Sequence, residues 1–378
     1  MTTRKFFKKV HLWLSLPVGL IITIICITGA ILSFETEILE SYYPERYFVK
    51  EVKETKIPVD QLIPIVNAQL KDNTVASIKV SSNPERTYVA SLTDGFRISA
   101  FVDPYTGDLK GTYSFRDSFF FTMMSLHRWL MDGSRTWGKY TVGITTILFV
   151  FILISGLVWW FPTDKKKLKS RFTIKTKSGL KRFLHDIHVS LGIYVCIFLL
   201  ISALTGLMWS FEWYRNGVCK LFGVEIPAEK GGKEGKGGGG KGNKEDKKPR
   251  EINYQSWQAA LDNLTKQVPN NEYIIISDGA ATVLDKSAPH LRATDKYSLD
   301  NVSGEVLKTD LFAEQKSVSK IMSWAYALHV GAVGGIVIRI LTCLACIIGG
   351  TLPLTGYYMF YRKNLKKSKK KRPIASAS

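Results

Sequence analysis

KKVHLWLSLPVGLIITIICITGAILSFE, residues 8–35, is repeated in outline by HDIHVSLGIYVCIFLLISALTGLMWSFE, residues 185–212. Superposing the two stretches places His188 on His11 and Thr205-Gly206 on Thr28-Gly29. Each stretch has a histidine near its start and then a long run without charge. The repetition predicts that one structural unit, beginning with an apolar helix, is used twice in this chain.

Four stretches of the 378-residue chain carry no charged residue. A helix needs about 20 apolar residues to cross the hydrocarbon core of a membrane, and each stretch is that long. Backbone groups in lipid must be satisfied within the segment, so we interpret each as a membrane-spanning helix rather than a buried helix of a soluble protein. The four stretches are Leu12–Phe34, Tyr140–Thr163, Val189–Phe211 and Ile340–Tyr361.

Charge predicts the orientation of these helices. The net charge of +20 comes from residues 1–11, 164–184 and 362–378, which are rich in Lys and Arg. Basic residues favour the cytoplasmic side, so we expect both termini and the middle loop to be cytoplasmic. We interpret the basicity as topological and expect no nucleic-acid partner. The first apolar stretch is too long for a cleaved signal peptide.

The regions between the membrane segments repeat as well. Residues 102–109 and 299–306 both read as a turn with an acid at its start and Gly at its end, between short β-type runs. Each region begins with a helix-like stretch, 59–70 or 254–268, and the first continues with strands near 75–80, 87–92 and 97–102. The Gly/Lys-rich residues 228–250 lack a counterpart in the first half and read as a flexible linker.

The predicted fold is therefore a membrane all-α four-helix bundle with two periplasmic α+β domains, related by an internal parallel duplication. The predicted boundaries are TM1 with a cytoplasmic N-terminus (1–35), periplasmic domain 1 (36–118), a His-bearing helix and TM2 (119–163), a basic cytoplasmic loop (164–184), TM3 (185–213), periplasmic domain 2 with the linker (214–320), a His-bearing segment and TM4 (321–361) and a basic cytoplasmic tail (362–378).

Four histidines lie at the ends of the membrane segments in two matched pairs. His11 and His188 begin the first and third segments, both expected near the cytoplasmic face. His127 and His329 precede the second and fourth, both expected near the outer face. Two facing imidazoles from different helices are the axial ligand set of a bis-histidine haem. The pattern predicts two b-type haems.

Other polar residues are candidates for a supporting role. His185 lies one turn before His188 and is a neighbour of the haem, a propionate contact or the rival ligand. Arg128, Lys139 and Arg339 are candidate partners for haem propionates, although each could simply anchor its helix at the interface. We interpret His290 as a surface residue. Glycines occur at matched helix positions, where they allow close packing of helices or of a flat macrocycle: Gly29, Gly156, Gly206 and Gly356.

The sequence also argues against several other cofactors. Cys343 and Cys346 lie within an apolar segment without the further ligands of a zinc or iron–sulfur centre. No Cys-x-x-Cys-His occurs, which excludes covalently attached c-type haem. No Gly-rich nucleotide loop is present, so an electron donor carrying flavin or nicotinamide must be another molecule.

These residues resemble the PepSY-associated transmembrane family. The resemblance rests on KKVHLWLSLPVGL (8–20), VDPYTG (102–107), LHRWL (126–130) and HDIH (185–188), and it covers nearly the whole chain apart from 228–250. The family includes siderophore-linked iron reductases of the bacterial inner membrane, such as ferrioxamine reductase. The resemblance implies four helices, two haems and reduction of a ferric siderophore in the periplasm to release ferrous iron.

The expected function is thus a haem-dependent ferric-siderophore reductase that takes electrons from an unidentified cytoplasmic donor. Two alternatives remain open. One is a non-enzymatic membrane protein whose PepSY-like domains bind a peptidase or envelope partner. The other is a transporter of iron or siderophore, although a transport pathway should show charged or broken helices at mid-membrane, and no acid lies within the four segments.

Overall fold

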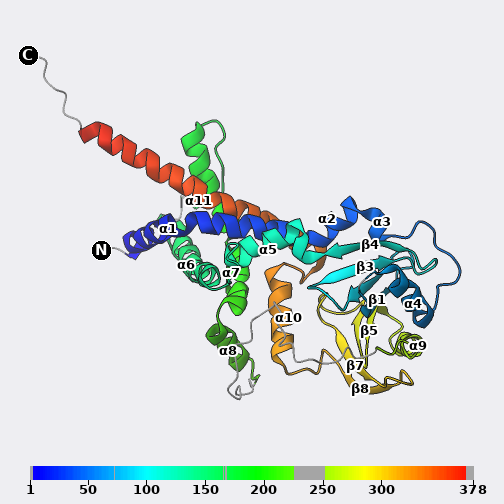
Figure 1. Cartoon of the computed structure of the whole chain (residues 1–378). Coiled ribbons are helices and arrows are strands. Elements are labelled where there is room, and N and C mark those ends of the chain that lie inside the picture. Colours follow the sequence, from blue (N-terminus) through cyan, green and yellow to red (C-terminus); the bar gives the residue numbers. More distant parts are fainter. Residues whose placement is uncertain (1–2, 72, 165, 167, 225–251, 372–378) are drawn as a thin grey trace, which may run out of the picture. The chain divides into compact units, whose positions relative to one another are not determined.

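The computed structural model describes residues 3–71, 73–164, 166, 168–224 and 252–371. The described chain divides into two compact units (Figure 1). The helical unit takes the described residues of Met1–Ser33, Thr122–Val218 and Ala325–Ser378, and the sheet unit those of Phe34–Phe121 and Cys219–Trp324. The predicted linker 228–250 lies outside the described residues.

Four helices of the helical unit are long and apolar enough to cross a membrane: α1 (Thr3–Leu32), α6 (Trp137–Trp160), α7 (Leu180–Ser210) and α11 (Gly335–Lys371). The prediction of four membrane helices is confirmed. The helices α1 and α7 begin earlier than the charge-free stretches indicated, because the Lys and Arg residues before each stretch are good helix formers. His11 and His188 therefore lie inside these helices and not at their starts.

The four long helices pack as a bundle. Helices α6 and α11 each contact both α1 and α7, so α1 and α7 lie diagonally opposite each other. Small side chains permit close approach: a methyl group on Gly349 would lie 2.9 Å from Leu199. The core of the bundle is formed by Val18, Ile22, Cys26, Ile152, Leu153, Val195, Leu199 and Ala345.

A short helix precedes each of the two long helices α6 and α11. These helices are α5 (Phe119–Trp129), which carries His127, and α10 (Val318–His329), which carries His329. Each is followed by a sharp turn before the long helix starts. Leu130 and Met131 take positive φ angles of 50° and 59° in the first turn, and Gly331 takes 72° in the second. The turns end each short helix at or just after its histidine.

The sheet unit contains one eight-stranded antiparallel sheet, in the order β4-β3-β2-β1-β5-β6-β7-β8. The strands of the first half are β1 (Val75–Ser81), β2 (Tyr88–Leu92), β3 (Ile98–Val102) and β4 (Leu109–Ser114). Those of the second half are β5 (Asn271–Ser277), β6 (Ala280–Asp285), β7 (Asp295–Leu299) and β8 (Val306–Asp310). Three of the first four were predicted within two residues of their observed ends.

Two helices cover one face of this sheet, α4 (Val59–Gln69) and α9 (Trp257–Gln267), which lie together beside β1 and β5 in Figure 1. Their apolar sides and the alternate residues of the strands form a single core. Trp257, Leu62 and Leu264 are among its largest fully buried side chains. Burying each Leu side chain of this kind stabilises the fold by about 1.5–3 kcal/mol.

The two regions between the membrane helices, expected as separate α+β domains, share this sheet and its core. Strands β1 and β5 pair antiparallel, with Ile78 opposite Ile276 and Val80 opposite Ile274. Each is the first strand of its half, and an unpaired first strand would be an exposed edge that readily pairs with another strand. Pairing between β1 and β5 joins the two four-stranded halves into one sheet. The sequence pattern of either region alone does not indicate this pairing. The shorter helices include α2 (Glu35–Tyr42), α3 (Pro44–Tyr47), α8 (Glu212–Leu221) and the 3-10 turns Phe115–Asp117 and Lys169–Arg171.

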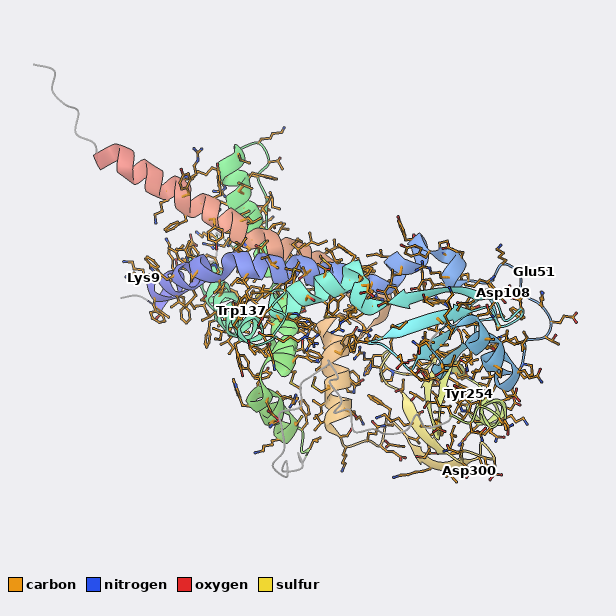
Figure 2. All side chains as sticks on the ribbon, in the orientation of Figure 1. Lys9, Glu51, Asp108, Trp137, Tyr254 and Asp300 are labelled. Carbon is orange, nitrogen blue, oxygen red and sulfur yellow. The ribbon has the colours of Figure 1, made fainter. Side chains whose placement is uncertain are left out.

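The two predicted turns have the same backbone geometry. In the first, the Gly107 N–H donates to the Asp103 carbonyl at 2.9 Å, and in the second the Gly304 N–H donates to the Asp300 carbonyl at 3.0 Å. Both glycines take positive φ, 78° and 72°, which a side chain would disfavour. Figure 2 labels Asp108 and Asp300, which mark the two turns.

One sequence-based interpretation in the sheet unit is wrong. His290, expected at the surface, is only 5% exposed. Its ring packs against Phe312 and Trp324, with centroids 5.4 and 4.6 Å away, and its Nδ1 accepts a hydrogen bond from the Arg292 N–H. The loop after β6 contacts α10 through His290 and Trp324. No periodic pattern in the sequence indicates this tertiary contact.

Candidate cofactor site of paired histidines

The structure brings the four predicted histidines together in the two predicted pairs. The ring centroids of His11 and His188 are 6.2 Å apart, with the ring planes at 86°. Those of His127 and His329 are 6.0 Å apart, at 69°. The helix α1 rises about 27 Å from His11 to Gly29, the residue beside His127, at about 1.5 Å per residue. This rise is close to the thickness of a hydrocarbon core, about 30 Å.

Three of the four imidazoles contact a backbone carbonyl of a neighbouring long helix. His127 Nδ1 lies 2.9 Å from the Ile25 carbonyl of α1, and His329 Nδ1 lies 2.8 Å from the Ser202 carbonyl of α7. His11 Nδ1 lies 3.0 Å from the Ile152 carbonyl of α6. In these three cases a carbonyl oxygen accepts, so the Nδ1 atom carries the proton.

A hydroxyl accompanies each of these contacts. Thr28, Ser155 and Thr205 lie 3.3, 3.4 and 3.1 Å from Nδ1 of His127, His11 and His329. His188 Nδ1 lies 2.8 Å from the Thr355 hydroxyl, which itself donates to the Leu352 carbonyl. Because that hydroxyl proton is already used, Thr355 accepts from Nδ1–H. The hydrogen-bond network thus assigns the same tautomer to all four histidines.

That tautomer leaves the Nε2 lone pair of each ring available as a ligand. Metal-binding histidines typically donate the other ring N–H to a carbonyl or carboxylate, which fixes the ring orientation. Burial also favours the neutral ring, lowering the pKa of His127 to about 4 and lowering that of His329. The positive charge of Arg128 lowers both further. Both imidazoles are therefore neutral at pH 7, the form that binds metals.

Next to each hydroxyl in the sequence is a glycine that the imidazole ring contacts. A methyl group on Gly29 would lie 2.9 Å from His127 Cε1, and one on Gly206 would lie 3.2 Å from His329 Cε1. The matching distances are 3.0 Å from Gly156 to His11 and 3.8 Å from Gly356 to His188. The sequence contains the signal as a Ser/Thr-Gly dipeptide in each long helix. Sequence reasoning used the glycines but missed the hydroxyl contacts and which histidine each glycine serves.

A cavity of about 140 Å³ opens beside the first pair. Both His11 and His188 line it, and the remaining walls come chiefly from α6 and α7, including Gly156 and Trp159. The walls are predominantly apolar side chains, and the two imidazoles face into the space. Apolar walls with a few polar groups among them are typical of ligand-binding sites.

A family model described as the PepSY-associated TM region matches residues 8–363, nearly the whole chain. The chain belongs to the PepSY-associated transmembrane family. The match spans all four histidines and both halves of the sheet unit. No curated protein matches the chain.

The candidate cations Arg128, Lys139 and Arg339 differ in their surroundings in this PepSY-associated protein. Arg128 is half-buried beside the second pair, and burial together with the charge of Arg135 lowers its pKa. Arg339 instead donates from Nε to the Ser33 carbonyl at 2.7 Å, just after the end of α1. Lys139, its equivalent in the first half, is exposed. Arg128 is thus the candidate cation that the structure brings closest to the histidines of this pair.

His185 points differently from His188. Its side chain is 53% exposed, and its Nδ1 lies 3.3 Å from the Asp186 carboxylate. It lines the mouth of the cavity, whereas the His188 ring faces His11. The geometry therefore favours His188 as the partner of His11 and leaves His185 as a neighbour of the site.

Proposed function

We propose that this PepSY-associated membrane protein binds two b-type haems, one between His11 and His188 and one between His127 and His329, and reduces a ferric siderophore. The observation that carries the proposal is the pair of facing imidazoles, repeated at both ends of the bundle with the same tautomer. A bound haem would supply one-electron transfer between its ferric and ferrous states.

The separation of the rings supports this proposal. Two metal–imidazole bonds of about 2.0 Å, with about 1 Å from each nitrogen to its ring centre, place the centroids about 6 Å apart. The observed separations are 6.2 and 6.0 Å. This spacing fits a group that would be held by His11 with His188 or by His127 with His329.

The donor set supports haem over a bare metal ion. Among the described residues, no group of three or more His, Cys, Asp or Glu side chains could hold a metal. A protein zinc site usually takes three or four such ligands. Two imidazoles suffice only where a macrocycle provides the other donors. The contacting glycines at both pairs and the apolar cavity at the first are compatible with a flat ring.

The position of the two pairs supports transfer across the membrane. They lie at opposite ends of helices long enough to span it. With the basic segments on the cytoplasmic side, the His11–His188 pair would face the donor and the His127–His329 pair the outer side, next in sequence to the sheet unit. We include in the proposal an internal duplication and an outer location for the sheet unit. Reduction releases the metal because hard siderophore oxygens bind Fe(III) more strongly than Fe(II).

The direct test is the absorption spectrum of the detergent-purified protein, oxidised and after dithionite. We expect a low-spin six-coordinate b-type spectrum, and two haems per chain by the pyridine haemochrome assay. The variants His11→Ala/His188→Ala and His127→Ala/His329→Ala should each retain one haem. A colourless protein that remains monodisperse and helical after expression with added haem precursor would overturn the proposal and favour a non-enzymatic binding protein.

A further inference from the structure

The cavity beside His11 and His188 has a cation on its wall that the sequence did not single out. Arg171 lines the cavity together with His185. It belongs to the loop between α6 and α7, where basic side chains otherwise read only as topological signals. Arg171 is half-buried, unlike its exposed neighbour Lys169.

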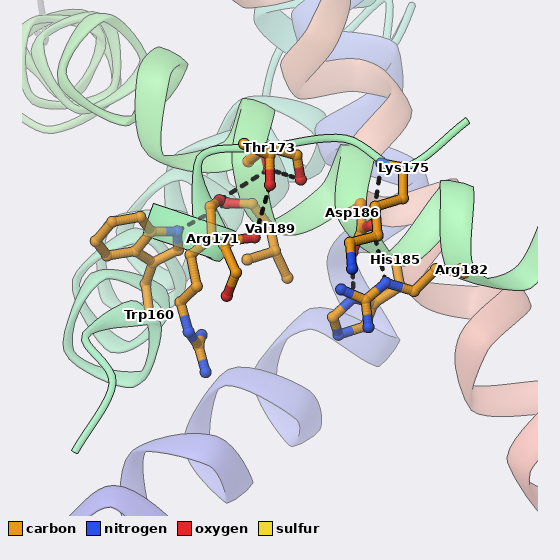
Figure 3. A network of polar contacts seen from close by, with 10 residues as sticks. Trp160, Arg171, Thr173, Lys175, Arg182, His185, Asp186 and Val189 are labelled. Carbon is orange, nitrogen blue, oxygen red and sulfur yellow. Dashed lines mark hydrogen bonds and ion pairs between the residues drawn. The ribbon is translucent and has the colours of Figure 1, made fainter. Parts of the chain in front are cut away.

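This loop is fastened to α7 by side-chain hydrogen bonds (Figure 3). The Ser190 hydroxyl lies 2.8 Å from the Arg171 carbonyl and 3.4 Å from the Thr173 carbonyl. The buried Asp186 carboxylate accepts from the Lys175 N–H at 3.3 Å and from Arg182 Nε at 2.9 Å. The backbone of Arg171 is thereby held at a fixed place beside the cavity.

The guanidinium of Arg171 has unbalanced charge. Burial lowers its pKa, and the nearby positive charge of Arg4 lowers it further. Across the described part of the chain, no Asp or Glu forms an ion pair with Arg171. A partly desolvated cation next to a second cation is unfavourable unless an anion is bound there.

We infer that Arg171 binds a carboxylate of the haem held by His11 and His188, with His185 at the same mouth of the cavity as a second donor. The inference rests on the proposed function, because the anion is a propionate of that haem. Arg and carboxylate groups form paired, charge-assisted hydrogen bonds in a fixed geometry. Figure 3 shows the side chains of Arg171 and His185 extending to the same side of the fastened loop.

A lipid phosphate offers similar oxyanion chemistry. We favour the propionate because Arg171 lines the cavity that contains the two histidines. A residue whose role is to bind lipid headgroups would instead sit on the outer surface of the bundle, like the exposed Lys169. The two sources differ in one property that an experiment can change: the haem carboxylates can be esterified.

The experiment uses the full chain with His127→Ala and His329→Ala, so that only the His11–His188 site is loaded. Apo-protein is reconstituted with haem b or with its dimethyl ester, and the rate of haem transfer to apomyoglobin is measured. We expect Arg171→Gln to accelerate loss of haem b at least about tenfold, a difference of about 1.4 kcal/mol. It should leave the loss of the dimethyl ester unchanged. Arg171→Lys should restore part of the retention, and Lys169→Gln is the matched control.

The outcomes are distinguishable. If the parent binds no haem, the proposed function fails before Arg171 is tested. If the parent binds haem and Arg171→Gln changes its loss by less than twofold, the inference is overturned while the function stands. Equal acceleration for haem b and its ester, dependent on phosphatidylglycerol in nanodiscs, would assign Arg171 to lipid and would also overturn it.

Discussion

The imidazole of His127 lies against Gly29 so closely that a methyl group on Gly29 would stand 2.9 Å from its Cε1 atom. Real Cβ atoms essentially never approach that closely, so any larger residue there must displace the ring or the helix. The contacts are slightly looser from Gly156 to His11 and from Gly206 to His329, at 3.0 and 3.2 Å, while Gly356 leaves ordinary contact distance to His188. The four glycines are alike in sequence but differ in how tightly the ring fits.

These differences give a graded prediction. Gly29→Ala should displace the His127 ring, costing about 1–3 kcal/mol of packing, and should leave about one haem per chain. Gly356→Ala should retain two haems, because its methyl group would lie 3.8 Å from His188. Haem content by pyridine haemochrome and thermal unfolding measure both effects. Loss of haem in Gly356→Ala with full content in Gly29→Ala would show that ring contact does not control occupancy.

The hydroxyl contacts predict a second difference between the histidines. The Thr355 hydroxyl is the 2.8 Å acceptor for His188 Nδ1, whereas His127 has both the Ile25 carbonyl at 2.9 Å and Thr28 at 3.3 Å. Loss of such a partner typically weakens metal binding about 10–100-fold. We expect Thr355→Val to accelerate haem loss about tenfold and Thr28→Val to have a smaller effect.

Thr355→Ser is the control for this comparison, since it keeps the hydroxyl and should restore retention. Rates would be measured by transfer to apomyoglobin in chains that retain only the relevant pair. If Thr355→Val and Thr355→Ser behaved alike, packing of the methyl group and not the hydrogen bond would orient His188.

The choice between His185 and His188 is also testable. The His188 ring faces His11 at 6.2 Å, while the His185 side chain is 53% exposed and contacts Asp186. His188→Ala should therefore abolish haem binding at this pair, and His185→Ala should preserve the six-coordinate spectrum. The two variants are compared by low-temperature absorption and EPR spectroscopy. The opposite result would show that His185, one helical turn earlier, is the ligand and that His188 is not.

Much of this architecture could be predicted from the sequence, for identifiable reasons. The four membrane helices follow from uncharged runs of sufficient length, and the turns at Asp103 and Asp300 follow from their acid and glycine residues. The pairing of the histidines follows from matched positions in the two halves. These signals are local, or depend on simple superposition of one half on the other.

The features that could not be predicted are tertiary. The shared sheet depends on pairing between β1 and β5, which are far apart in the chain. The role of Arg171 depends on a loop fastened by Ser190 and Asp186, whose side chains read in sequence only as polar residues of a helix. Burial of His290 depends on the aromatic residues that fold over it. None of these contacts has a fixed spacing along the chain.

His290 gives a pH-dependent prediction for the sheet unit. Burial, and to a lesser extent the charge of Arg292, lowers its folded-state pKa. The unfolded chain therefore binds the proton more readily, and its contribution to stability is complete above the unfolded value near 6.5. That contribution is lost as the pH falls from about 6.5 toward the lower folded-state pKa. Thermal unfolding should show a fall in stability between pH 7.5 and 5.

The matched variant is His290→Phe, which keeps an aromatic ring between Phe312 and Trp324 and cannot be protonated. We expect its unfolding temperature to vary less over this pH range than that of the parent. An identical pH dependence in the two proteins would mean that other groups dominate the acid sensitivity.

The final prediction concerns where iron is reduced. If the His127–His329 pair faces the siderophore, then His329→Ala should still be reducible by dithionite at the remaining haem, yet should be reoxidised by ferric siderophore at least about tenfold more slowly, a barrier rise of about 1.4 kcal/mol. Lys169→Gln, which changes an exposed residue outside both pairs, should match the parent. Stopped-flow absorption follows reoxidation, and a ferrous chelator captures the released iron. A His329→Ala protein that retains only the His11–His188 haem and still reduces siderophore at the parental rate would show that electrons leave elsewhere. The assignment as a reductase acting through the second pair would then have to be withdrawn.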